Sequence, residues 1–250
     1  TAADYADGRV TTLAQYRARE RQLLDQVRTE ITQQLTTADR LPHNRFNPGS
    51  RSDPGVWALN WNRTFVLQPA AEPIGGVLLL HGLTDSPYSL RSFARVLATQ
   101  GYRVVGLRLP GHGFAPSGLL TFKAEDLEAA TRLAMRDLRA SLGAGKPIQM
   151  IGYSNGAALA VSYALDATTD LTLPRPAGLV LISPAIGIIY ANVYEGAEFG
   201  ITPEVAQHMG SPASLEGMQK IYPELRKRGV RVLVGGDYGF PNNPTGTNAK

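Results

Sequence analysis

One five-residue segment limits the folds available to this chain of 250 residues more than any other feature. Residues 152–156 read Gly-Tyr-Ser-Asn-Gly, after the apolar run 148–151 and before the helix-forming stretch 157–165. A strand that passes directly into a helix turns so sharply that side chains two positions before and after the turn would collide, and glycine occupies both positions. The segment therefore predicts a sharp strand–turn–helix unit that raises the Ser154 hydroxyl at the edge of a sheet.

Short apolar runs alternate with amphipathic helical stretches on both sides of that segment. We expect strands at 64–67, 77–80, 102–107, 148–153 and 179–182, and helices at 87–100, 124–142 and 155–165. This alternation is typical of an α/β fold with a mostly parallel, doubly wound sheet and helices on both faces. Ligands of such sheets bind outside the carboxyl ends of the strands.

The first 62 residues form an extension that precedes the sheet domain of residues 63–250. Residues 12–36 predict an amphipathic helix whose apolar positions are Leu24, Val27, Ile31 and Leu35. Packing of this helix on the flank of the domain is the favoured interpretation, and contact with a membrane surface or a partner is the alternative. The proline- and glycine-rich stretch 41–62 predicts a long loop.

The composition excludes several classes of protein and site. The chain has no cysteine, which removes disulfides, cysteine nucleophiles and thiolate metal sites. The net charge of +4 is spread along the sequence rather than gathered into a stripe, so we expect no nucleic-acid partner. No apolar run reaches the ~20 residues of a membrane span. A cytoplasmic protein and a protein exported after removal of an upstream segment both remain open.

Ser154 is the candidate nucleophile, and the helix after it directs its positive N-terminal end toward the position of a developing oxyanion. Acyl transfer also needs two backbone N–H donors, one from the residue after the serine and one from a loop after an earlier strand. Asn155 and Leu83 are the expected donors. His81 ends a strand and precedes the serine, so we interpret it as a brace for the loop rather than as a base.

Four segments together resemble the α/β-hydrolase superfamily over about residues 15–188, and within it the lipase and esterase branch that includes monoacylglycerol-lipase-like and serine-aminopeptidase-like hydrolases. They lie at 75–82 (Gly-Gly-Val-Leu-Leu-Leu-His-Gly), 108–113 (Arg-Leu-Pro-Gly-His-Gly), 152–156 and 181–185 (Leu-Ile-Ser-Pro-Ala). The resemblance implies an α/β-hydrolase fold, a Ser-Asp-His triad in that chain order, a cap after strand 179–182, no cofactor and a small-molecule ester or lipid-like substrate.

The chain departs from this family after residue 190. Asp237 follows the apolar run 230–234 and fits the acid of a triad, but no histidine comes after it. The four histidines are His43, His81, His112 and His208. Of these, His208 is the candidate base, in a short predicted helix at 202–208 within the cap-like or divergent region 190–229. The sheet would be incomplete at its C-terminal side if no further strand follows.

A second, fainter resemblance concerns residues 229–240, which look like a late segment of metal-dependent amidohydrolases. In that family an aspartate at the end of a late strand serves the metal, and Asp237 would match it. The early His-x-His metal pair of the family is absent, and about 60 residues cannot close a β/α barrel of ~250 residues. We therefore assign no metal ligand to the chain.

The sequence thus predicts a serine hydrolase that cleaves carboxylic esters, esterase- or lipase-like, through an acyl-enzyme on Ser154 and a backbone oxyanion hole. One alternative is a non-catalytic or truncated α/β-hydrolase-like module that lacks the triad histidine. Another is a fusion with an amidohydrolase-like, metal-dependent segment. The identity of the ester and the oligomeric state stay open at this stage.

Overall fold

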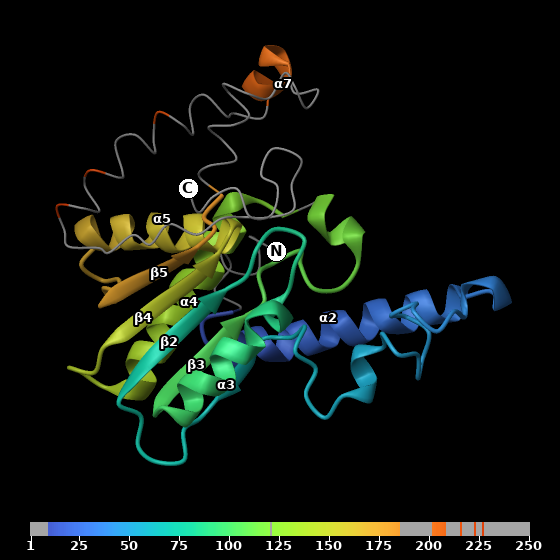
Figure 1. Ribbon diagram of the computed structural model, residues 1–250, viewed down its shortest axis with the longest axis horizontal. Helices are drawn as coiled ribbons and strands as arrows, with labels where there is room; N and C mark the ends of the chain where they lie inside the picture. The colour runs from blue at the N-terminus through green and yellow to red at the C-terminus, as the bar shows by residue number, and fades with distance from the viewer. Residues whose placement is uncertain are drawn as a thin grey trace, which may run out of the picture.

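The computed structural model describes residues 10–120, 122–185 and 202–208, together with single positions 216, 223 and 227. Within these residues five strands form one sheet in the order β1-β3-β2-β4-β5 (Figure 1). Strands β2 to β5 run parallel, and β1 pairs antiparallel with β3. Their bounds are β1 Phe65–Leu67, β2 Gly75–Leu80, β3 Tyr102–Leu107, β4 Ile148–Tyr153 and β5 Gly178–Ile182.

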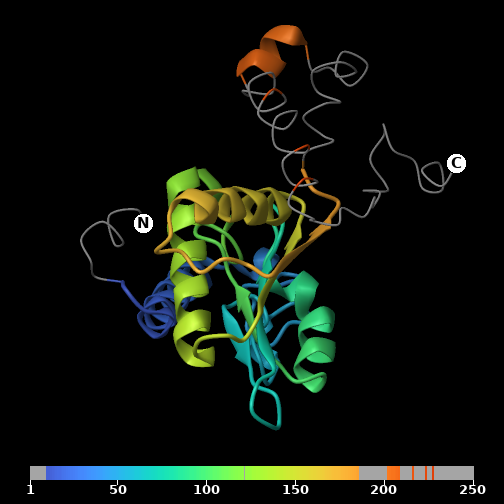
Figure 2. The same cartoon turned by 90° about the vertical axis from the view of Figure 1, so that its left-hand side faces the viewer.

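Helices cover both faces of the sheet, which confirms the predicted doubly wound architecture (Figure 2). α4 and α5 lie on one face and α3 on the other. The predicted helix 87–100 divides into a 3₁₀ turn, η3, which begins at a proline, and the α-helix α3. The helix bounds are α2 Leu13–Gln34, η3 Pro87–Leu90, α3 Arg91–Thr99, α4 Ala124–Leu142, α5 Asn155–Thr169 and α7 Pro203–His208.

The core is divided in two by β2, every residue of which is buried. Leu78 and Leu80 pack with the side chains of α4 and α5, whereas Val77 and Leu79 pack with Ala94 of α3. A strand at the centre of a parallel sheet has no face toward water, which explains why its sequence is continuously apolar rather than alternating.

The register of the sheet brings four strand ends to one edge. Leu80 lies opposite both Leu107 and Gly152, and Tyr153 lies opposite Ile182. The chain passes from β2 to β3 on one side and then to β4 on the other, so the strand order reverses at β2. Ligands of open α/β sheets bind at such a reversal, next to the carboxyl ends of the strands.

The N-terminal helix α2 begins with a capping box, in which Thr12 and Gln15 bond reciprocally to each other's backbone. Its buried residues are Leu13, Tyr16 and Glu20. The face predicted from the sequence, Leu24 to Leu35, is only half-buried, and α2 extends past the sheet in Figure 1. The prediction of a helix was right, but the residues that the helix buries lie in its N-terminal half and include a charged one. No helix in the described ranges has the length and apolarity of a membrane span.

Candidate active site

Ser154 occupies the turn between β4 and α5 in a backbone conformation that few residues other than glycine adopt. Its φ of 51° and ψ of −115° lie outside the regions favoured for residues with a side chain. Strain of this kind persists only where the surroundings fix it, and it concentrates at functional sites. The predicted strand–turn–helix unit is therefore present, with the serine at its apex.

The two glycines of the turn are required by close backbone contacts. A Cβ at Gly156 would collide with the carbonyl groups of Leu80 and His81, and a Cβ at Gly152 would collide with the backbone of Gly156 and Ala157. Because both obstacles are backbone atoms, a side-chain rotation cannot relieve them. The glycine spacing in the sequence is thus explained by two contacts: Gly156 lies against the end of β2, and Gly152 lies against the first residues of α5.

Hydrogen bonds tie the turn to the end of β5. The Ser154 N–H donates to the Ile182 carbonyl over 2.9 Å, and the Ser154 carbonyl accepts from the N–H of Ala185 over 3.3 Å. The same carbonyl also accepts from the first turn of α5, from Ala157 over 3.0 Å and Ala158 over 3.2 Å. The serine is half-buried, and its backbone is held by neighbours on two sides.

The loop after β2 lies directly beside the serine. An added Cβ at Gly82 would sit 3.4 Å from the Ser154 Cβ and 3.1 Å from the Tyr153 ring. Neither the Leu83 N–H nor the Asn155 N–H donates a hydrogen bond to another described residue. Asn155 thus follows Ser154 directly, and Leu83 follows the Gly82 that lies beside the serine; both N–H groups are unpaired in the part of the chain that the structure describes.

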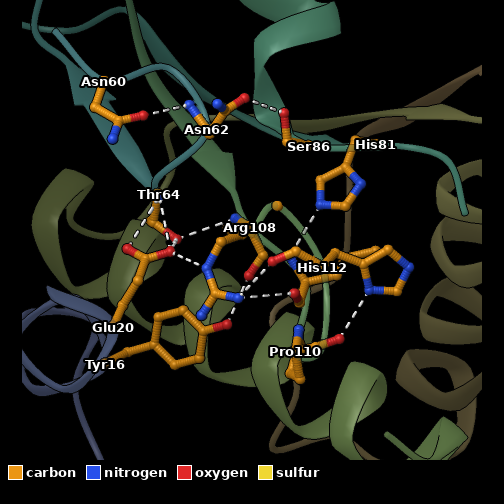
Figure 3. A network of polar contacts seen from close by, with 12 residues as sticks. Tyr16, Glu20, Asn60, Asn62, Thr64, His81, Ser86, Arg108, Pro110 and His112 are labelled. Carbon is orange, nitrogen blue, oxygen red and sulfur yellow. Dashed lines mark hydrogen bonds and ion pairs between the residues drawn. The ribbon is translucent and has the colours of Figure 1, made fainter. Parts of the chain in front are cut away.

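His81 is fully buried and braces this loop (Figure 3). Its Nε2 accepts from the Leu109 N–H over 3.0 Å, so its Nδ1 carries the proton and donates to the Gly82 carbonyl over 2.8 Å. Burial lowers the pKa of His81 to about 3, and the nearby His112 and Arg108 act in the same direction. With both ring nitrogens occupied, His81 holds loops together, as the sequence indicates, and has no nitrogen left for a serine proton.

His112 lies in the loop after β3, between the rings of His81 at 5.3 Å and Phe122 at 5.0 Å. Its Nδ1 is 2.8 Å from the Pro110 carbonyl, whereas its buried Nε2 has no hydrogen-bond partner in the described ranges. Burial lowers the pKa of this imidazole as well. The ring is thus held within the loop after β3 by its hydrogen bond and its two ring contacts.

A group that the sequence did not single out lies behind these loops. Glu20 of α2, only 2% exposed, is bonded to Arg108 and to Thr64, and the Tyr16 hydroxyl donates to the Arg108 carbonyl (Figure 3). The spacing of Leu13, Tyr16 and Glu20 by three and four positions places them on one helical face. That spacing was the one feature of the sequence that could have indicated a buried face here, although a glutamate at such a position is usually solvent-exposed.

The general base and its carboxylate stay predictions. His208 ends α7, but its side chain is not among those described, and Asp237 and the amidohydrolase-like segment 229–240 lie outside the described residues. His43 is exposed in the loop after α2. The described residues contain no group of three or more histidine, aspartate or glutamate side chains that could hold a metal ion.

Residues 76–197 match the family model of the alpha/beta hydrolase fold. No curated protein matches the chain. A solved structure of LipS and LipT, two metagenome-derived lipolytic enzymes, is 30% identical, covering 56% of this chain and 54% of that chain with a TM-score of 0.44. A probable hydrolytic enzyme from Pseudomonas aeruginosa PAO1 is 24% identical (50% and 39% covered, TM-score 0.39).

The monoacylglycerol lipase of Paleococcus ferrophilus is 18% identical, with 53% of this chain and 50% of that chain covered and a TM-score of 0.38. The chain therefore spans about half, or less, of the length of these solved structures.

Proposed function

Because residues 76–197 match the model of the alpha/beta hydrolase fold, we propose that this chain is a serine hydrolase of carboxylic esters with Ser154 as its nucleophile. The observation that carries the proposal is the strained Ser154 at the β4–α5 turn, which lies against Gly82 of the loop after β2. The N–H groups of Asn155 and Leu83, the residues next to Ser154 and Gly82, have no partner among the described residues. In hydrolases of this fold, such a turn is the nucleophile elbow.

The reaction would proceed in two halves. Ser154 Oγ attacks the acyl carbon while its proton passes to a histidine, and the carbonyl oxygen becomes an oxyanion that accepts hydrogen bonds from Leu83 and Asn155. The histidine then gives the proton to the departing alcohol, which leaves an acyl-serine. Water attacks this ester in the same way, releases the acid and restores the serine hydroxyl.

We assign the base to His208 and the carboxylate that orients it to Asp237. His81 is unsuited to this role because both of its nitrogens are bonded to main-chain groups. A serine without a base is a weak nucleophile, so the activity depends on this assignment more than on any other.

The substrate class is an ester with an apolar acyl group. Leu83 is 53% exposed and follows Gly82, the residue that lies against the serine, so it offers an apolar surface in the loop next to the site. Binding sites for small molecules are lined mostly by apolar side chains with a few polar groups that fix orientation.

Labelling with a fluorophosphonate tests the nucleophile, since the probe reacts only with an activated serine. The native protein should be labelled, and Ser154→Ala should abolish the labelling. Ser183→Ala is the matched control, because Ser183 also directly follows a strand at this edge and has a positive φ of 41°. Labelling that survives Ser154→Ala would rule out Ser154, and a folded protein without labelling or ester turnover would favour a non-catalytic α/β-hydrolase-like module.

A further inference from the structure

The helix α2 is attached to the sheet domain through a buried polar cluster of Tyr16, Glu20, Thr64 and Arg108 (Figure 3). The Glu20 carboxylate accepts from the Thr64 N–H over 3.0 Å, from the Thr64 hydroxyl over 3.1 Å and from Arg108 Nε. The Tyr16 hydroxyl donates to the Arg108 carbonyl over 2.6 Å. Three of these four residues precede residue 76, where the match to the family begins.

Simple packing of a helix on a flank does not require such a cluster. Removing a carboxylate and a guanidinium from water costs more than apolar contact of the same area, unless hydrogen bonds satisfy both groups. Here the carboxylate oxygens have several donors, and Arg108 also donates from Nη1 to the His112 carbonyl over 2.8 Å. The cluster therefore does more than attach α2 to the domain. It also fixes the position of Arg108, at the start of the loop after β3.

Two further hydrogen bonds connect the loop after β3 to the loop that lies against the serine. Leu109, next to Arg108, donates its N–H to His81 Nε2, and His81 Nδ1 donates to the Gly82 carbonyl. Gly82 is the residue that lies against Ser154. The path from Glu20 therefore leads through Arg108, Leu109 and His81 to the segment that carries the Leu83 amide.

The far end of the same loop is braced independently. The Ser86 hydroxyl donates to Asn62 Oδ1 over 2.7 Å, and the Asn62 N–H donates to Asn60 Oδ1 over 3.1 Å. Residues 81–86 are thus held at both ends. One end is bonded to Asn62, and the other is connected through Leu109 and Arg108 to Glu20, so both connections end within the first 64 residues of the chain.

We propose that Glu20 is a positioning residue for the oxyanion-binding amide of Leu83, which makes α2 a structural part of the site. This inference rests on the function proposed above. A donor displaced from its place around an oxyanion loses stabilisation that exists only in the transition state, so the loss appears in kcat rather than in KM.

Glu20→Gln tests the proposal, with Glu30→Gln as the matched control on an exposed turn of the same helix. Glutamine keeps the size of the side chain, but presents Arg108 with a neutral acceptor and turns an N–H₂ group toward the N–H of Thr64. We expect kcat for p-nitrophenyl butyrate to fall about tenfold or more with KM changed less than about twofold, whereas complete loss of one oxyanion donor costs roughly 10²–10³. Glu30→Gln should leave both constants unchanged.

Hydrogen exchange gives a second readout that needs no activity. Amides of residues 82–86 and 109–112 should exchange faster in Glu20→Gln than in Glu30→Gln. Unchanged exchange together with unchanged kcat, in a variant that merely melts at a lower temperature, overturns the proposal. If the native protein cleaves no ester, the proposed function fails, and the exchange rates still decide whether Glu20 holds the loop.

Tyr16→Phe covers the case in which Glu20→Gln does not fold. It removes the bond from the Tyr16 hydroxyl to the Arg108 carbonyl. Tyr163→Phe is its control, since the Tyr163 hydroxyl also donates to a carbonyl, that of Pro174, over 2.9 Å. A fall in kcat and faster exchange at 82–86 in the first variant alone support the proposal. Equal behaviour of the two variants contradicts it.

Discussion

The ring of His81 accepts a hydrogen bond at Nε2 from the N–H of Leu109, 28 positions later in the chain, over 3.0 Å. This bond joins the loops that follow β2 and β3, and it leaves the only ring proton at Nδ1, which points to the Gly82 carbonyl. The imidazole therefore works as a neutral link between two main-chain segments. Its protonation would remove the acceptor that Leu109 needs.

The first prediction follows from the pKa of His81, which burial lowers from 6.5 to about 3. Between these values the unfolded chain binds a proton that the folded chain does not, so stability falls as the pH drops from about 6.5 toward 3. Above pH 6.5 this group contributes no pH dependence. The slope is at most about 1.4 kcal/mol per pH unit.

Urea unfolding between pH 8 and pH 4 measures this slope. His81→Leu should lower stability at every pH but flatten its decline in acid, leaving the part that comes from the carboxylates and from His112. His43→Leu, which alters an exposed histidine, should retain the slope of the native protein. An equally steep decline in His81→Leu would contradict the neutral, buried state of His81.

The second prediction concerns the turn at Ser154. In Gly156→Ala the new methyl group meets the Leu80 and His81 carbonyls at the end of the central strand, and these main-chain groups cannot rotate away. We expect the free energy of unfolding to fall by about 1–3 kcal/mol. We also expect most of the ester hydrolysis to be lost. Gly178→Ala is the control, because its methyl group meets only the end of the flexible Gln149 side chain. Similar stability of the two variants would show that the contact at Gly156 can relax.

The third prediction is that Glu20 and Arg108 depend on each other. Glu20→Met or Arg108→Met alone removes one member of a buried ion pair, at a cost of about 3–5 kcal/mol in unfolding free energy. The double variant removes both charges, so it should lose clearly less than the sum of the single variants. The same cycle on Glu72 and Lys146, where Glu72 is 85% exposed, should be close to additive. Additivity at both pairs would refute the coupling.

The fourth prediction tests the base. His208→Ala should lower kcat by at least about 10³-fold, because the serine would lose its proton acceptor. His43→Ala should leave kcat unchanged, since that histidine is exposed in the loop after α2. Retained activity in His208→Ala would transfer the role of base to another group.

Those parts of the fold that depend on local spacing were predictable from the sequence. The five apolar runs became the five strands within one or two residues at each end, because their apolar side chains supply the core on the two faces of the sheet. The turn at Ser154 followed from two glycines, since only local backbone contacts decide whether a side chain fits there.

The polar cluster on α2 was not predicted, because its partners are distant in the sequence. Glu20 and Arg108 are 88 positions apart, and a charged residue within an amphipathic helix is ordinarily placed toward water. The antiparallel pairing of β1 was missed for a similar reason, since three residues carry no signal of direction. His208 and Asp237 stay predictions because the choice of a base depends on distances rather than on order along the chain.

The bonds that tie Ser154 to Ile182 and Ala185 matter for anyone who would recombine this protein with another hydrolase. A chimaera in which the sequence after residue 185 comes from another hydrolase has its junction next to Ile182 and Ala185, the residues that are hydrogen-bonded to the turn at Ser154. A junction that alters the path of residues 182–185 would displace the hydroxyl even though every residue of the turn is kept. Crossovers are therefore better placed in the loop between α5 and β5, at residues 170–177, so that β5 and its exit are inherited together.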